Sequence, residues 1–347
     1  MPPVIPWCRA SDQGLPKSNH GQEVQISHAD RGARASFDRR TIPGAAVEEF
    51  WTAADGHRIR NITWPQPEGA PRGSILFMPG RGDAYEKYIE TFEHWRRQGW
   101  QVTGCDWRGQ AASGRLGADE LTGHIEDFGV WTADLAAFWE HWMANVPAPH
   151  VLAGHSMGGH LVLRAAADGL VRPDALILSA PMLDTHPTWV PLAVRQRFAN
   201  WMASRGDPRR PAWKWSEKPG EFPAGRIKLL THDEERYADE GYWREQRPEV
   251  VMGPGSWGWV ARSLDSTAAI DAPGALEQID IPVFLMGTRA DKLVSFDAIA
   301  RSGRRLPNVE TLYFGSEARH EILREADPVR DRALAAIDGF LDRHFAT

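Results

Sequence analysis

Residues 149–168 read PHVLAGHSMGGHLVLRAAAD, and this stretch decides the fold. Its first residues form a short apolar run that is typical of a buried strand, and its last residues favour a helix. Between them lies the pattern Gly-x-Ser-x-Gly at 154–158, which predicts a sharp strand-to-helix turn that presents Ser156. Because the chain contains 32 glycines, the pattern can also arise by chance, and its surroundings must decide what it means.

The rest of the chain alternates short apolar runs with helical patterns. Strand-like runs lie at 74–78, 100–105, 150–153, 175–179, 283–286 and 309–314, and helical runs at 85–98, 127–145, 157–168 and 327–344. This alternation predicts an α/β fold with a mostly parallel, doubly wound sheet. Before this region, apolar and polar residues alternate over residues 47–64 on either side of Asp55-Gly56, which predicts an N-terminal antiparallel hairpin.

Two segments depart from this alternation. Residues 1–41 are polar and lack periodicity, so we expect a poorly ordered extension. Residues 185–279 are rich in Trp, Pro and Arg and are too long for an ordinary connection, which predicts an inserted lid with helices of its own. Residues 42–184 and 280–347 then form the core. The insertion follows a strand end, where α/β sheets bind their ligands.

Composition excludes several classes of protein. A net charge of -6 offers no basic field for nucleic acid. The two cysteines, Cys8 and Cys105, provide neither a disulfide framework nor a metal site, and we expect no metal and no cofactor. No apolar run is long enough to span a membrane, and the first residues lack the plan of a signal peptide, so a cytoplasmic location is expected. Transient contact with a membrane surface stays open, and the oligomeric state is not indicated.

Partners for Ser156 follow in the order that nucleophilic catalysis requires. A serine hydroxyl needs a histidine base, which a carboxylate orients. Asp291 follows the strand-like run 283–286 and His320 follows the run 309–314, so both lie in loops at the sheet edge that carries Ser156. Asp184, which follows an earlier strand, is an alternative acid. The stretch HEILR at 320–324 lacks the second histidine of a zinc-peptidase motif.

Donors for a developing oxyanion are predicted from two backbone positions. The loop MPGRGD at 78–83 follows the first core strand, and its Gly80 permits a tight turn. We expect the N–H groups of Arg81 and Met157 to point at the oxygen that becomes negative in a tetrahedral intermediate. Trp189, Trp257 and Trp259 of the insertion are candidates for a substrate pocket.

Five motifs carry a family resemblance over roughly residues 47–345. They are GHSMGGH at 154–160, DWRGQAASGR at 106–115, PGRGDAYEKY at 79–88, RHEILRE at 319–325 and LTHDEERY at 230–237. With these motifs the chain resembles α/β-hydrolases of the lysophospholipase and monoacylglycerol lipase group. The resemblance implies a metal-independent serine hydrolase that cleaves carboxylic esters of single-chain lipids.

Two departures from the group affect the substrate prediction. Pro79-Gly80 stands where members commonly have His-Gly, and Ala111 stands where they have a second glycine. A positive φ at Ala111 would cost about 1 kcal/mol. We expect Asp106 and Arg108 to fasten this loop through a salt bridge. A small-ester carboxylesterase or an aminopeptidase-like hydrolase on the same fold remains an alternative, as does a noncatalytic protein that binds a lipid or a partner.

Overall fold

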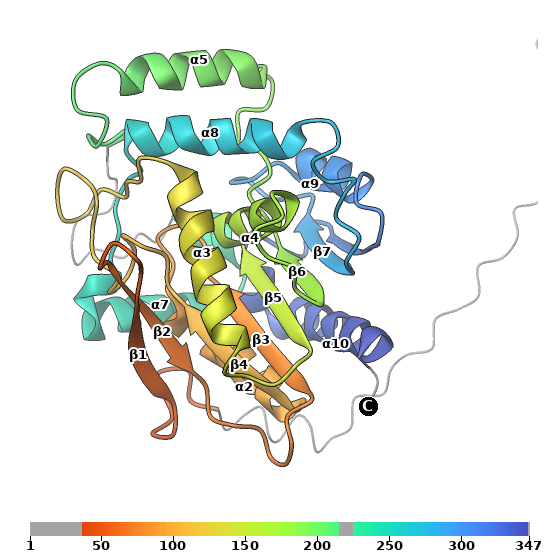
Figure 1. The fold of residues 1–347 in the computed structure, drawn as a ribbon. Helices are drawn as coiled ribbons and strands as arrows, with labels where there is room; N and C mark the ends of the chain where they lie inside the picture. The colour runs from red at the N-terminus through yellow and green to blue at the C-terminus, as the bar shows by residue number, and fades with distance from the viewer. Residues whose placement is uncertain (1–36, 215–224, 346–347) are drawn as a thin grey trace, which may run out of the picture. The chain divides into compact units, whose positions relative to one another are not determined.

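Eight strands form one sheet in the order β1-β2-β4-β3-β5-β6-β7-β8 (Figure 1). The strands are β1 (Val47–Thr52), β2 (Arg58–Thr63), β3 (Gly73–Met78), β4 (Trp100–Cys105), β5 (His150–His155), β6 (Ala175–Ser179), β7 (Val283–Thr288) and β8 (Val309–Phe314). β1 pairs with β2 and β2 with β4 in antiparallel fashion, and every later pairing is parallel. The predicted fold class, a mostly parallel sheet with an antiparallel start, is confirmed.

The structure is a computed structural model that describes residues 37–214 and 225–345. Contacts divide the chain into Met1–Asp38 and Arg39–Thr347, and every element named here belongs to the second unit. The extension expected over residues 1–41 falls mostly outside the described residues. At its end, Arg39 and Arg40 donate hydrogen bonds to the two carboxylate oxygens of Asp239, at 2.6 and 2.7 Å.

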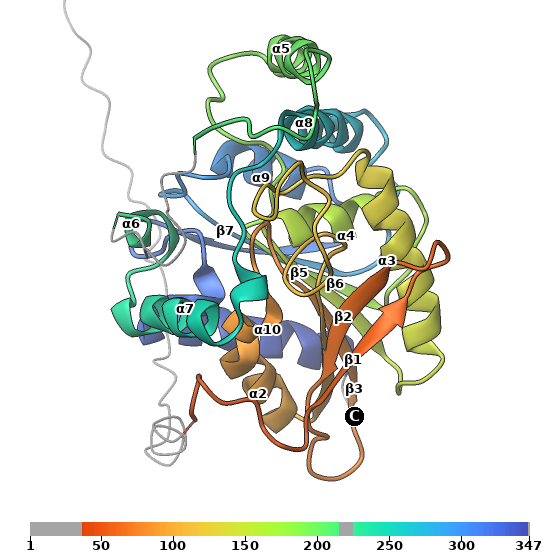
Figure 2. The same cartoon turned by 90° about the vertical axis from the view of Figure 1, so that its left-hand side faces the viewer.

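Helices cover both faces of the sheet, because successive strand residues point to opposite sides. The core helices are η1 (Tyr85–Tyr88), α2 (Ile89–Arg97), α3 (Phe128–Met143), α4 (Met157–Ala167), α9 (Phe296–Gly303), η3 (Ile322–Arg324) and α10 (Asp327–His344). α3 and α4 pack together on one face, while α2 and α10 lie on the other (Figure 2). On β3, Leu76 and Met78 join the cluster under α3 and α4, whereas Phe77 contacts Phe92 of α2 at 5.6 Å between ring centroids.

The sequence-predicted elements differ from the structure at two places. The single helix expected over 85–98 begins as the 3-10 turn η1 and becomes α-helical only from Ile89. The helix α9, for which no helical run was assigned, is eight residues long. It is capped by the preceding Ser295, whose hydroxyl accepts the Ala298 N–H at 3.2 Å. Both differences concern short segments, where periodicity is a weak signal.

The inserted segment, residues 185–279, forms α5 (Leu192–Ala203), α6 (Ile227–Leu230), α7 (Glu234–Gln246), η2 (Pro248–Val250) and α8 (Trp257–Asp271). α8 lies next to the core near α3 and α4, and α5 packs on its outer side (Figure 1). α6 and α7 lie apart from this pair, and α7 lies beside α2 and α10 (Figure 2). Within the described ranges, no helix combines the length and apolarity needed to cross a bilayer.

Candidate active site

Ser156 occupies a strained turn between β5 and α4. Its backbone has φ 51° and ψ -117°, in the region that favours glycine. Its N–H donates to the Ser179 carbonyl at 3.0 Å, which fastens the turn to the neighbouring strand β6. Side chains at Gly154 and Gly158 would block the turn, because a Cβ atom at Gly158 would collide with the carbonyl oxygens at the end of β3. The glycines therefore permit the tight approach of β3, β5 and α4 that presents the serine.

The three predicted triad residues lie in one hydrogen-bonded row. His320 Nε2 is 2.9 Å from Ser156 Oγ, and His320 Nδ1 is 2.7 Å from Asp291 Oδ2. The residues come from the loops that follow β5, β7 and β8, so the parallel sheet brings them to one edge. An ionised carboxylate can only accept, so Nδ1 carries the hydrogen. Nε2 is then left to accept the serine hydroxyl proton.

Electrostatics support this tautomer. Burial lowers the pKa of His320, but the carboxylates of Asp291, Glu321 and Asp83 together outweigh this effect, so the pKa of His320 lies above its usual 6.5. Burial would raise the pKa of Asp291, yet His320 and the N–H groups of Val294 and Leu293 bring the pKa of this carboxyl below its usual 3.8. These N–H groups donate to Asp291 Oδ1 at 3.0 and 2.8 Å, so Asp291 is ionised and held in place.

The alternative acid, Asp184, and a second buried histidine near the turn, His160, have other partners. Asp184 receives a bidentate pair of hydrogen bonds from Arg195 at 2.8 and 2.9 Å, which engages its carboxylate at the start of the insertion. His160 is fully buried, with its ring nitrogens 2.9 Å from the Met182 carbonyl and 2.7 Å from the Ser266 hydroxyl. His160 is thus a packed core histidine.

The two predicted oxyanion positions flank the serine. A Cβ atom at Gly80 would lie 3.2 Å from Ser156 Cβ, so the loop that carries Arg81 passes directly beside the serine. Met157 is the first residue of α4, where backbone N–H groups have no acceptor within the helix. The Arg81 side chain turns toward the insertion. It donates to the Gly253 carbonyl at 2.8 Å, and its guanidinium lies 5.0 Å from the ring centre of Trp259.

A cavity of about 1270 Å³ opens over this row, lined by Ser156 and His320 and by residues of α5, α6 and α8. Trp257 and Trp259 line it, whereas Trp189 is 84% exposed and lies outside the lining. Further lining residues that the sequence reasoning did not single out are Met182, Val190, Val194, Phe198, Trp213, Met252 and Leu264. The helical spacing of Val194 and Phe198 is the one signal that could have indicated them.

Comparison with known proteins gives the family. The family model of serine aminopeptidase, S33, matches residues 69–327. The chain belongs to this family of serine hydrolases. Lysophospholipase L2 of Escherichia coli (strain K12) is 29% identical over 284 residues, covering 78% of this chain and 80% of that protein. The monoacylglycerol lipase of Mycolicibacterium smegmatis is 28% identical over 155 residues, covering 44% and 53% of the two chains.

Solved structures agree on the fold. A soluble variant of monoglyceride lipase from Saccharomyces cerevisiae, in complex with a substrate analog, superposes with a TM-score of 0.69 and 20% identity. The match covers 89% of this chain and 99% of that one. The monoacylglycerol lipase of Paleococcus ferrophilus gives a TM-score of 0.63 at 21% identity, over 82% and 99% of the chains. This S33 hydrolase therefore has the α/β-hydrolase fold.

The loop over residues 106–115 of this S33 hydrolase is fastened differently from the prediction. Asp106 and Arg108 do not pair with each other. Asp106 accepts from Arg60 at 2.6 Å, and Arg108 donates to Asp134 at 2.6 Å and to Asp55. Arg108 reaches outward to α3 and to the hairpin turn, so the loop is tied to two other elements and not closed on itself.

Ala111 in the same loop, which stands where related hydrolases have a glycine, adopts a positive φ. Its φ is 45°, a conformation that alanine tolerates at a cost. The Ala111 methyl group is buried against Ala84 and Val250. Contact with the insertion thus offsets part of the backbone strain that a glycine would avoid.

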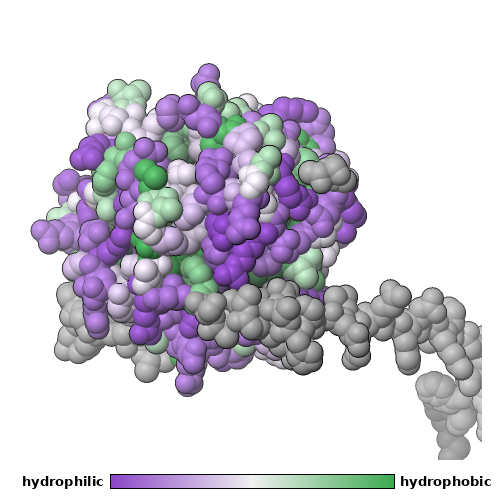
Figure 3. Space-filling view, turned by 90° about the horizontal axis from the view of Figure 1, so that it is seen from below, coloured by the Kyte–Doolittle hydropathy of each residue, from purple (hydrophilic) through white to green (hydrophobic). Residues whose placement is uncertain are grey.

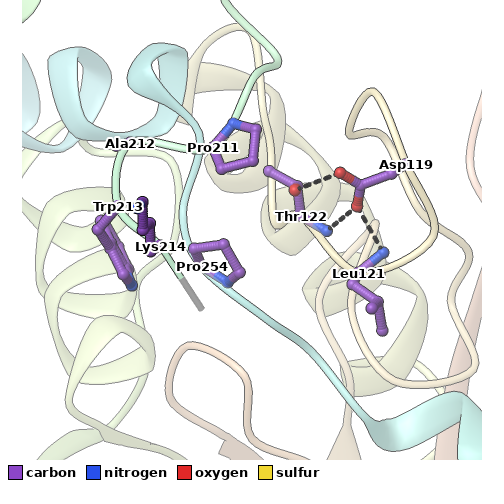
Figure 4. Close-up of a pocket in the computed structure, with 8 residues that line it drawn as sticks. All are labelled: Asp119, Leu121, Thr122, Pro211, Ala212, Trp213, Lys214 and Pro254. Carbon is purple, nitrogen blue, oxygen red and sulfur yellow. Dashed lines mark hydrogen bonds between the residues drawn. The ribbon is translucent and has the colours of Figure 1, made fainter. Parts of the chain in front are cut away.

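A second cavity of about 420 Å³ lies on the loop around Leu121 (Figure 4). Ala212 and Trp213 line both this cavity and the large one. Its carboxylate, Asp119, is engaged by the N–H groups of Leu121 and Thr122 at 2.9 and 2.6 Å and by the Thr122 hydroxyl. The carboxylate of this cavity thus serves its own loop, and the large cavity, which Ser156 and His320 line, is the candidate reaction site.

Proposed function

We propose that the protein is a serine hydrolase that cleaves the carboxylic esters of single-chain lipids, lysophospholipids or monoacylglycerols, through an acyl-Ser156 intermediate. The observation that carries the proposal is the row Ser156, His320 and Asp291 at the wall of a large cavity. Family membership supports the chemistry. The names of the relatives from Escherichia coli and Mycolicibacterium smegmatis support the substrate class.

The proposed reaction has two halves, and in each half His320 acts first as base and then as acid. His320 Nε2 takes the hydroxyl proton while Ser156 Oγ attacks the ester carbonyl carbon, and the carbonyl electron pair moves onto oxygen. Collapse of this intermediate breaks the ester C–O bond, and His320 returns the proton to the leaving alcohol. Water then attacks the acyl carbon while His320 takes a proton from it. Collapse breaks the bond to Ser156 Oγ, and His320 returns the proton to Oγ, which releases the fatty acid and restores Ser156. Asp291 stabilises the imidazolium that forms in each half.

The N–H groups of Arg81 and Met157 are the proposed oxyanion donors. They belong to the loop beside Ser156 and to the first turn of α4, where the helix dipole also favours negative charge. Loss of one such donor typically costs about 10²- to 10³-fold in rate. The contribution of Arg81 is that of its backbone, because its side chain is held by the Gly253 carbonyl and by Trp259.

Cavity size and lining favour a lipid acyl chain. Pockets for small ligands usually enclose about 300–1,000 Å³, and this one encloses about 1270 Å³. Apolar residues of α5 and α8 line it, among them Phe198, Trp257 and Leu264. We therefore propose that residues 185–279 form a lid over the acyl chain.

The lining disfavours an aminopeptidase substrate. A free α-amino group would need an available carboxylate. Among the described lining residues, the carboxylates are Asp83 and Glu321, and both form ion pairs with Lys87 at 2.6 Å. The ester group of a lipid is uncharged and needs no carboxylate partner, so these pairs stay intact.

An exposed apolar ridge on the insertion suits contact with a lipid surface. Trp189, Val194, Phe198 and Trp201 are each half-exposed or more, on and just before α5. Val194 and Phe198 also line the cavity, so the ridge continues into its mouth. By contrast, the face seen from below is mainly hydrophilic (Figure 3). Tryptophan is enriched at membrane interfaces, and we propose that α5 touches the lipid surface that supplies the substrate.

A substrate panel tests the proposal. The panel contains a monoacylglycerol, a lysophospholipid, a short p-nitrophenyl ester and an aminoacyl amide, with Ser156→Ala as the control. We expect turnover of the two lipids to exceed that of the short ester and the amide, and no turnover by the variant. Preference for the short ester or the amide would favour the alternative hydrolases. Lipid binding without turnover would make the protein a noncatalytic binder.

A further inference from the structure

Next to the catalytic row, one ammonium group lies among three carboxylates. Lys87 Nζ is 2.6 Å from Asp83 Oδ1, 2.6 Å from Glu321 Oε1 and 3.1 Å from Glu240 Oε2. All four side chains are at most 5% exposed. Buried charges of one sign are costly unless paired, so the ammonium is what allows the carboxylates to lie together. Its own pKa is raised, because these carboxylates outweigh the effect of burial.

The three carboxylates belong to three separate parts of the site. Asp83 ends the loop that passes beside Ser156, Glu321 directly follows His320, and Glu240 lies on α7 of the insertion. Asp83, Glu321 and His155 bring their ligand atoms within 4.8 Å of one another. This cluster has the geometry to hold a cation, and the Lys87 ammonium is the cation that lies against Asp83 and Glu321.

Asp83 connects the ammonium to the proposed oxyanion loop. Its second oxygen accepts the Tyr88 hydroxyl at 2.6 Å and the Gly80 N–H at 3.4 Å. Gly80 precedes Arg81, whose N–H is a proposed oxyanion donor. The position of the Asp83 carboxylate therefore bears on the direction of that N–H.

Glu321 connects the same ammonium to the base. The side chain of Glu321 also pairs with Arg324, and its backbone N–H donates to the Leu230 carbonyl at 2.8 Å. Burial would raise the pKa of Glu321, but Lys87 and Arg324 bring it down to about 2, so the carboxyl is ionised. A shift of Glu321 would move its neighbour His320.

We propose that Lys87 is a positioning residue for the hydrolysis, which sets the spacing between the oxyanion loop and the His320 loop by holding Asp83 and Glu321 on one ammonium. Lys87 acts through these carboxylates and takes no part in bond making. The inference rests on the proposed ester hydrolysis. It adds that the α7 part of the insertion, through Glu240, is anchored to the catalytic loops.

The pH profile of the reaction distinguishes this role from a purely structural one, because the pKa of His320 depends on the charges around it. The charged and titratable groups that face His320 are Asp291, Glu321 and Asp83, which raise its pKa, and His155, whose ring centre is 4.8 Å away. Removal of the Lys87 charge leaves Glu321 and Asp83 less neutralised and raises the pKa of His320 further. His320 acts as a base only when it is neutral. The decline of kcat/KM on the acid side of its pH profile, the acid limb, should therefore move to higher pH.

The test compares Lys87→Met with Lys228→Met, which removes the same charge from an exposed site on α6. On the ester that the wild type hydrolyses best, Lys87→Met should lower kcat about 100-fold, because a displacement of about 1 Å can cost that much. KM should stay within about threefold of the wild-type value. The acid limb of the pH profile should move to higher pH. Lys228→Met should match the wild type. Unchanged kcat, or a loss of kcat with no movement of the limb, would overturn the proposal.

Two further variants keep the test decisive. Glu240→Gln leaves the ammonium between the two loop carboxylates, so kcat should stay within about threefold, and a loss as large as that of Lys87→Met would contradict the proposal. If Lys87→Met does not fold, Lys87→Arg replaces it. A guanidinium retains the charge but not the geometry, so kcat should fall at least tenfold, and a wild-type kcat would refute the proposal. Failure of the proposed function is distinguishable, because the wild type itself would then not hydrolyse the ester.

Discussion

A Cβ atom added to Gly154 would lie 2.7 Å from the carbonyl carbon of Gly158, so the end of β5 and the first turn of α4 are in direct backbone contact. This contact makes the turn at Ser156 as tight as it is. The same turn brings the N-terminus of α4 beside the loop that follows β3. The closeness of these two glycines is therefore a condition for the whole site.

Gly154→Ala tests this contact. The added methyl group has no room against the backbone of α4, so we expect a loss of about 1–3 kcal/mol in the free energy of unfolding, measured by urea denaturation. The fall in esterase activity should exceed what the loss of folded protein accounts for, because the turn positions Ser156. Gly44→Ala is the matched control, since no atom lies within 4 Å of a Cβ placed there. Equal stability and activity of the two variants would contradict the account of the turn.

The pH dependence of the wild type follows from the raised pKa of His320. The base must be neutral, so kcat/KM should decline as the pH falls through a value above the usual 6.5. In Asp291→Asn the histidine loses its stabilising carboxylate, so this decline should move to lower pH, and kcat should fall about 10⁴-fold. Asp184→Asn, which removes the charge that pairs with Arg195, should lose far less activity. A larger loss in Asp184→Asn would reverse the assignment of the acid.

The apolar ridge on the insertion predicts a separation between lipid and soluble substrates. The double variant Trp189→Glu and Trp201→Glu places charge on exposed positions, so it should bind phospholipid vesicles at least tenfold more weakly in co-sedimentation. Activity on a short soluble ester should change less than about twofold. Leu170→Glu alters an exposed apolar residue outside the insertion and is the control. Unaltered vesicle binding by the double variant would exclude the ridge as a docking surface.

Much of the fold could be predicted because its strands are short, apolar and regularly spaced. Parallel strands then bring the loops after β5, β7 and β8 to one edge, so the order of Ser156, Asp291 and His320 in the chain was sufficient to place them together. The 3-10 start of η1 and the short helix α9 were not predicted, since segments of four and eight residues contain too few turns for a clear period.

Side-chain partners over long separations were not predictable. The pairing of Lys87 with Glu240 depends on where α7 of the insertion packs, and no local pattern encodes that. For the same reason Arg108 was expected to pair with Asp106 and instead meets Asp134 of α3. Trp189 was proposed for the pocket from its type alone, and its 84% exposure depends on the path of the chain before α5.

The central claim is that Ser156, activated by His320, attacks an ester. The most direct test is labelling of the full chain with a fluorophosphonate probe, followed by mass spectrometry of the labelled peptide. The account predicts one phosphonylated residue, Ser156, with labelling abolished in Ser156→Ala and slowed at least 100-fold in His320→Ala. Labelling of Ser156→Ala to the same extent as the wild type would contradict it.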